Sequence, residues 1–212
     1  YALRRQALGL VNIVLEHGLA LQLDEVLAGA YEAFIPVKPK LGRDETISEL
    51  MDFIVQRLRG ILLEQGFSYD VIDAAFARPS TDLLDMVHRV KVVQSFKAAG
   101  YYEDFMVVYN RSHNLSRQWE SEDVQAGALV DASEIQLYRQ VEGLKKRVEK
   151  SIGQKEYDQA LQDLSKVRPE LDSFFAAVMV MVDDEGLRSA RLGMLKTIAN
   201  LCNSIADFSK LV

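Results

Sequence analysis

Apolar residues recur every three or four positions along nearly the whole chain, the spacing that places them on one face of an α-helix. The longest such stripe runs from Ile47 to Leu62, and the helix is expected to end at Gly66. Other stripes, most of them followed by glycine or proline, lie at 3–14, 23–34, 71–76, 83–90, 102–109, 137–152, 157–164, 171–178 and 187–205. The pattern predicts an all-α fold.

Three helix starts carry capping signals. Thr46 with Glu49 and Ser133 with Gln136 have the spacing of a capping box, in which each side chain accepts a hydrogen bond from a free backbone amide. The acids at 183–184 precede the last stripe, where the helix dipole favours negative charge. We therefore expect Asp183 or Asp184 to cap the last helix, and the two capping boxes to begin the helices that follow them.

Two segments between the stripes are less regular. Residues 119–131 contain several acids and Gly127, and they are predicted to form an exposed loop. The Val-Met-Val-Met-Val run at 178–182 has the composition of a buried strand. Helical stripes flank this run and the pattern offers no partner strand, so we interpret it as a helix end followed by a connector.

Pro79 marks the best candidate for a domain boundary. Proline blocks the continuation of a helix, and the neighbouring Ser80 and Thr81 are residue types that cap a following one. We therefore expect a helical connector region over residues 1–80 and a helical-bundle domain over residues 81–212.

The composition is that of an ordinary soluble globular protein. Of the 212 residues, 49% are hydrophobic and 26% are charged. No apolar run approaches the roughly 20 residues that span a bilayer, so no membrane partner is expected. The single cysteine, Cys202, excludes an internal disulfide and fits a cytoplasmic location. The chain opens directly in a helical register without an initiator Met, and we interpret it as a segment of a longer protein.

The net charge of −6 is distributed unevenly along the chain. Residues 44–85 carry nine acidic and three basic side chains. Residues 86–117 carry five basic and two acidic side chains, and residues 139–155 carry six and two. An acidic first half followed by basic segments is compatible with a connector followed by an RNA-facing module. It is equally compatible with two differently charged solvated faces.

The sequence holds no convincing catalytic constellation. The three histidines, His17, His88 and His113, are isolated from one another and lack the spacing of zinc ligands. The acids at 183–185 are better explained by the helix dipole than by a cation site. Cys202 lies among apolar helical positions, as a small core residue does. We therefore predict no catalytic residue and no metal site in this chain.

Basic and amide side chains are better candidates for a functional site, and the function they indicate is ligand binding, not catalysis. Arg111, Asn114 and Arg117 recur every three residues, which places them along one side of a helix. Guanidinium and amide groups in such a row suit phosphate oxygens and exposed base edges. A solvated helix face is the alternative, and composition alone favours it.

Two further groups extend this hypothesis. Arg188 and Arg191 lie one turn apart near the start of the last helix, and Lys145 with Lys146 begins a basic cluster that continues to residue 150. Both groups are candidate RNA contacts. The alternatives are that Arg188 and Arg191 pair with the acids at 183–185, and that the cluster only favours solubility.

Two stretches resemble the beta subunit of bacterial-type glycyl-tRNA synthetase. The opening, YALRRQALGLV at residues 1–11, is similar to the segment that follows the family's HD-like domain. The tail from 167 to 195 is more closely similar, with a proline, a Phe-Phe pair, Val-Met-Val-Met, acids and Arg-x-x-Arg-Leu. It closes on Ala-Asp-Phe-Ser at 206–209. The two stretches occur in the family's order, so the resemblance extends over the chain.

The resemblance implies a DALR-type anticodon-binding domain from about residue 80, a helical bundle that arginyl-tRNA synthetase also uses. It implies that the complete enzyme joins glycine to its tRNA at the expense of ATP, with magnesium, and that the catalytic centre lies on a separate alpha subunit in an α2β2 assembly. This chain would contribute tRNA recognition and hold no cofactor itself. Arg111 and Asn114-Leu115 fall on the family's pattern of an arginine followed by Asn-Ile.

Two other interpretations remain open. The first is the DALR domain of another aminoacyl-tRNA synthetase, and the Val-Met-Val-Met and Ala-Asp-Phe-Ser tail argues against it. A helical protein-interaction adaptor that never touches RNA would expose a broad apolar patch instead of a basic groove.

Overall fold

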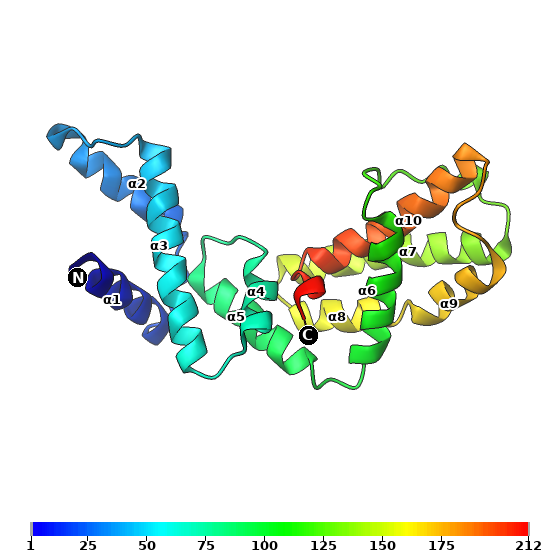
Figure 1. Ribbon diagram of the computed structural model, residues 1–212, viewed down its shortest axis with the longest axis horizontal. Coiled ribbons are helices and arrows are strands. Elements are labelled where there is room, and N and C mark those ends of the chain that lie inside the picture. The colour runs from blue at the N-terminus through cyan, green and yellow to red at the C-terminus, as the bar shows by residue number, and fades with distance from the viewer. Residues whose placement is uncertain (1, 212) are drawn as a thin grey trace. The chain divides into compact units, whose positions relative to one another are not determined.

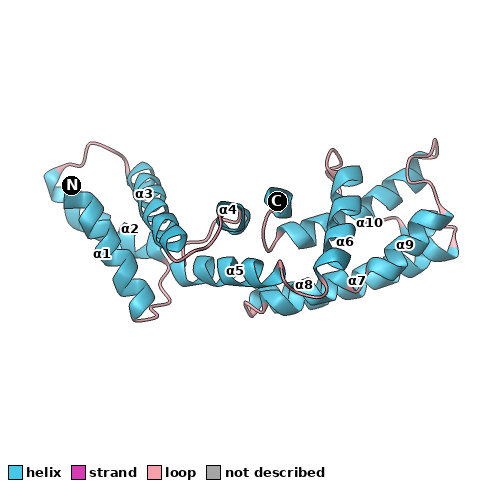
Figure 2. Ribbon diagram, turned by 60° about the horizontal axis from the view of Figure 1, so that its bottom comes forward, coloured by secondary structure: helices cyan, strands magenta, loops and turns pink. Residues whose placement is uncertain are grey.

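The computed structural model describes residues 2–211, and over this range it consists of helices joined by loops, without a strand (Figure 2). The all-α prediction is confirmed. The α-helices are α1 (Ala2–Glu16), α2 (Leu23–Phe34), α3 (Arg43–Glu64), α4 (Tyr69–Phe76), α5 (Leu83–Phe96), α6 (Tyr102–Ser116), α7 (Ala132–Gly153), α8 (Tyr157–Ser165), α9 (Arg168–Ala177) and α10 (Glu185–Asn203). Short 3-10 turns are η1 (Ile35–Val37), η2 (Ala126–Ala128) and η3 (Phe208–Lys210).

The chain forms two compact units that divide between Lys91 and Val92, inside α5. The first unit contains α1 to α4, and the second continues from Val92 to Ser209. Pro79 does break the chain between α4 and α5, but α5 itself runs from one unit into the other. The domain boundary expected between residues 80 and 81 stays a prediction.

In the first unit, α1 and α2 both pack against α3 (Figure 1). The stripe of α3 contributes Ile54, Leu58 and Leu62 to the core, each at most 3% exposed. The stripe predicted for α2 is exposed over most of its length, because only Leu23 is buried and Phe34 is 61% exposed.

The expected capping box of Thr46 and Glu49 is wrong. The helix begins at Arg43, one turn earlier, and Thr46 Oγ1 donates to the carbonyl of Gly42 at 2.8 Å from inside the first turn. Asp44 and Glu45 occupy that turn, where the helix dipole favours acids. Periodicity therefore located this helix, and the acids marked its start better than the threonine.

The second expected box is displaced by two residues. Asp131, not Ser133, is the N-cap of α7, and its carboxylate accepts from the Ser133 amide at 2.8 Å. Glu134 completes the box by accepting from the Asp131 amide at 2.9 Å. The stretch DASEIQ contains both an Asp-x-x-Glu and a Ser-x-x-Gln pattern, and the sequence alone gives no reason to prefer the first.

The second unit is built around α10, which packs against α6 and α7 (Figure 1). Nearly every residue of α10 from Ala190 to Cys202 is buried. The tail then returns Phe208 to the core, where its ring centroid lies 4.6 Å from that of Phe105 and 5.7 Å from that of Tyr109. Aromatic contacts of this kind stabilise a core beyond the area they bury.

The connector and the last helix start agree with the sequence predictions. Helix α9 ends at Ala177, and the Val-Met-Val-Met-Val run belongs to the segment between α9 and α10. Asp184 caps α10 by accepting from the amide of Leu187 at 2.9 Å.

The segment 119–131, which was expected to be an exposed loop, is fastened to the helices behind it. Glu122 accepts from Asn200 of α10 at 2.6 Å and from Lys145 of α7 at 3.2 Å. A Cβ atom added to Gly193 would lie 2.6 Å from the carbonyl oxygen of Asp123, so only glycine allows this approach. The loop is therefore part of the packed structure of the second unit.

We expect Gly193→Ala to destabilise the second unit by about 1–3 kcal/mol, because the new methyl group meets backbone that cannot rotate away. The control is Gly143→Ala in α7, where the nearest atom is the flexible end of Arg147. Thermal melting of both variants measures the difference. Equal melting temperatures for the two would contradict the close packing of the loop on α10.

Candidate nucleic-acid interface

The outer side of α6 carries Arg111 and Asn114, and Arg117 continues the row as the C-cap residue directly after the helix. All three are exposed. The opposite side of the helix buries Phe105 and Tyr109 in the core. The amphipathic pattern of α6 therefore orients the three polar side chains to solvent together, as their spacing predicted.

Arg111 is held in place on this surface. Its Nη1 donates to Asp172 Oδ1 of α9 at 2.5 Å, and its guanidinium carbon lies 5.4 Å from the ring centroid of Phe175. Both members of the ion pair stay close to half exposed. The guanidinium is thus oriented by an acid and an aromatic ring while the remainder of it faces solvent.

The basic cluster of α7 contains one paired and several open cations. Lys145 donates to Glu122 at 3.2 Å, and this hydrogen bond raises the pKa of the lysine. Lys146, Arg147 and Lys150 are exposed. Lys145 therefore fastens the 119–131 loop, and Lys146 is better placed to meet a polyanion.

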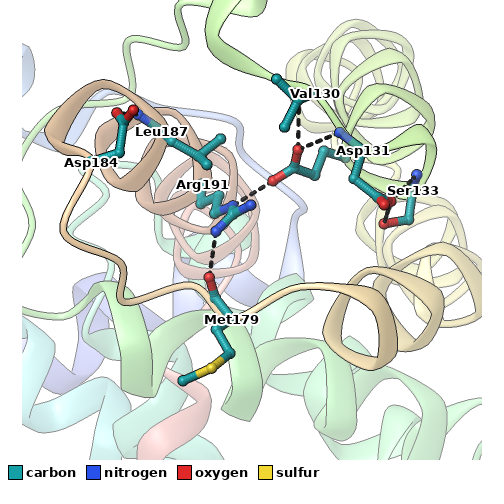
Figure 3. Close-up of polar contacts among 8 residues, drawn as sticks. Val130, Asp131, Ser133, Met179, Asp184, Leu187 and Arg191 are labelled. Carbon is teal, nitrogen blue, oxygen red and sulfur yellow. Dashed lines mark hydrogen bonds and ion pairs between the residues drawn. The ribbon is translucent and has the colours of Figure 1, made fainter.

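Arg188 and Arg191, expected to be a matched pair, have different environments. Arg188 is half-buried and its Nη1 donates to the carbonyl of Val182 at 2.7 Å. Arg191 is only 5% exposed, and its guanidinium binds both Glu134 and the carbonyl of Met179 (Figure 3). The expectation that Arg191 faces a binding groove is corrected, because the packing of α10 on α7 carries this position into the interior.

Glu134 is the buried partner that the sequence did not indicate for Arg191. One carboxylate oxygen takes the guanidinium, and the other accepts from the amides of Val130 at 3.0 Å and Asp131 at 2.9 Å. Its side chain is completely buried. Both oxygens of this carboxylate thereby have hydrogen-bond partners and its charge is paired, which is the condition under which a buried charge is tolerated.

Three further side chains of this unit are in packed or hydrogen-bonded positions. Tyr101 donates its hydroxyl to Asp158, and burial raises the pKa of that tyrosine. The ring of Tyr102 lies 5.0 Å from that of Phe96. Cys202 is buried, which raises the pKa of its thiol and disfavours the reactive thiolate.

Neither a metal centre nor a membrane segment is found in the part of the chain that the structure describes. Within residues 2–211, histidine, cysteine and acidic side chains nowhere gather in groups of three that could hold a metal ion. Over the same residues, each helix is too short or too polar to cross a bilayer.

Comparisons with known proteins agree with the two-part organisation. Residues 1–77 match the family described as glycyl-tRNA synthetase beta subunit, and residues 105–207 match the DALR anticodon binding domain. The chain is 53% identical, over its whole length, to part of the glycine–tRNA ligase beta subunit of Syntrophomonas wolfei. It is 37% identical over 213 aligned residues to the beta subunit of Desulforamulus reducens. In both cases the chain spans 31% of the relative's length.

We expect Arg191→Ala to cost about 3–5 kcal/mol of folding stability, because it leaves the carboxylate of Glu134 buried without its cation. Arg188→Ala removes only a half-buried hydrogen bond and should cost about 1 kcal/mol. Denaturant unfolding of the two variants measures both values. An Arg191→Ala protein as stable as the wild type would show that the buried pair does not support the fold.

Proposed function

The chain belongs to the glycyl-tRNA synthetase beta subunit family, and we propose that it is the part of that subunit that recognises the anticodon of glycine tRNA. The single observation that carries this proposal is that the match to an anticodon-binding domain lies entirely within one compact unit of the structure. The second compact unit, Val92–Ser209, contains the whole of the DALR match at 105–207. A separately folded helical unit with an exposed polar helix face is a suitable RNA-binding module.

In this proposal the complete enzyme joins glycine to its tRNA in the cytoplasm, using ATP with magnesium. The catalytic centre lies on a separate alpha subunit in an α2β2 assembly, and this chain supplies recognition without a catalytic group. The chain's own contribution is therefore binding energy that selects the tRNA before the chemical step takes place.

We assign the tRNA contacts to two groups of side chains, those on the outer side of α6 and the exposed cations of α7. Arg117 and Lys146 are open to solvent and suit phosphate oxygens, and Asn114 adds an amide that can meet a base or a ribose. Lys145 and Arg188 also hold loops in place. Arg191 supports the second unit from within.

We expect the affinity for tRNA to fall steeply with salt, because contacts between cations and phosphates release bound counterions. Lys146→Ala should weaken binding to all tRNAs similarly and lower the slope of log affinity against log salt by about 1. Lys40→Ala, which removes an equally exposed lysine from the first unit, is the control. Titrations of the full-length protein at several salt concentrations measure these slopes. Affinity that does not change with salt would favour a protein-interaction adaptor.

A further inference from the structure

Four charged side chains of alternating sign connect α6 and α9. Asp104 of α6 binds Arg168 of α9, and Arg168 also lies 3.5 Å from the second oxygen of Asp172. Asp172 in turn binds Arg111 of α6 at 2.5 Å. The four formal charges cancel. Each of these side chains is between 37% and 51% exposed, so the row lies open on the surface.

This row is poorly suited to phosphate. A phosphate site needs excess positive charge, whereas the charge of Arg111 is compensated by Asp172 at hydrogen-bonding distance. Half-exposed ion pairs also contribute little to folding stability, so the stability of the fold does not explain the arrangement well. What the pair does provide is a fixed set of hydrogen-bonding groups.

Arg111 and Asp172 present donors directly beside an acceptor. A guanidinium has five N–H donors, and the hydrogen bond to Asp172 occupies one of them. The carboxylate retains lone pairs that can accept from another group. Phe175 lies against the guanidinium and restricts its rotation, which keeps the planar donor edge aligned with the carboxylate.

We propose that Arg111 and Asp172 together read the edge of an unpaired cytosine. Arginine donates to O2 and N3 of the base, and the carboxylate accepts from the N4 amino group, a pairing known for acidic side chains. Uracil carries a carbonyl oxygen where cytosine carries this amino group, so it would set an acceptor against the carboxylate of Asp172. Uracil also carries an N3–H where cytosine has an acceptor, so it would set a donor against Arg111. The pair therefore selects cytosine over uracil, and both side chains contribute to the selection.

This inference rests on the proposed function, and that function supplies the ligand. Codons for glycine begin with a pair of guanines, so the anticodon of glycine tRNA carries a pair of cytosines. Unpaired anticodon bases expose their hydrogen-bonding edges, which is how single-stranded RNA is read by proteins.

The test is Asp172→Asn in the full-length protein, with glycine tRNA and variants in which one anticodon cytosine is replaced by uracil. For the wild type, we expect one of these replacements to weaken binding on the order of tenfold or more. For Asp172→Asn we expect that difference to become clearly smaller, because the asparagine amide can donate to O4 of uracil while Arg111 still favours the N3 acceptor of cytosine. Arg111→Ala should weaken binding to both tRNAs.

The matched control is Asp104→Asn, which makes the same charge change at the other end of the row and leaves the pair of Arg111 and Asp172 intact. It should retain the preference for cytosine. A smaller preference in both variants, or in neither, overturns the assignment of Asp172. A wild-type protein that binds tRNA equally with cytosine or uracil overturns it as well. A wild-type protein that binds no tRNA overturns the proposed function itself.

Discussion

The buried ion pair of Arg191 and Glu134 is the constraint on which the rest of the second unit depends. It joins the start of α7, the middle of α10 and the carbonyl of Met179 in the connector that follows α9. A charge this deep is costly unless it is paired and hydrogen-bonded, and here the two side chains bind each other and three backbone groups. The arrangement fixes how α7, α9 and α10 meet, and α6 packs on the scaffold that results.

The loop between α6 and α7 is likewise held in place by contacts with residues that are distant in the sequence. Its attachment relies on Glu122, which holds Lys145 and Asn200, and on the absence of a side chain at Gly193. The acidic segment 119–131 is therefore packed against the helices of the second unit. The proposed recognition surface on α6 is supported by a framework whose 119–131 loop is held in place, which would limit the entropy lost on RNA binding.

The helices were predictable because their signal is local, while most side-chain roles depend on distant partners. The stripes of α3 and α10 and the Asp184 cap follow from residues within a few turns of one another. Glu134 is 57 residues from Arg191, and Asp172 is 61 residues from Arg111. No spacing rule on α10 distinguishes a buried arginine from a half-buried one three positions earlier. The row on α6 was found from its spacing, but the acid and the ring that orient Arg111 were not.

The arginines of this unit therefore differ by the charge that surrounds them and by their burial. Arg191 is buried and its charge is neutralised by Glu134, so its interactions stabilise the fold and are not available to a ligand. Arg111 is neutralised but half exposed, which suppresses attraction for phosphate in general and leaves directional hydrogen bonds for one base. Arg117 is exposed at the end of the same helix row, where it suits a phosphate. Affinity that depends on salt and selectivity that depends on base identity would thus reside in different side chains of one surface, and substitutions can change each without the other.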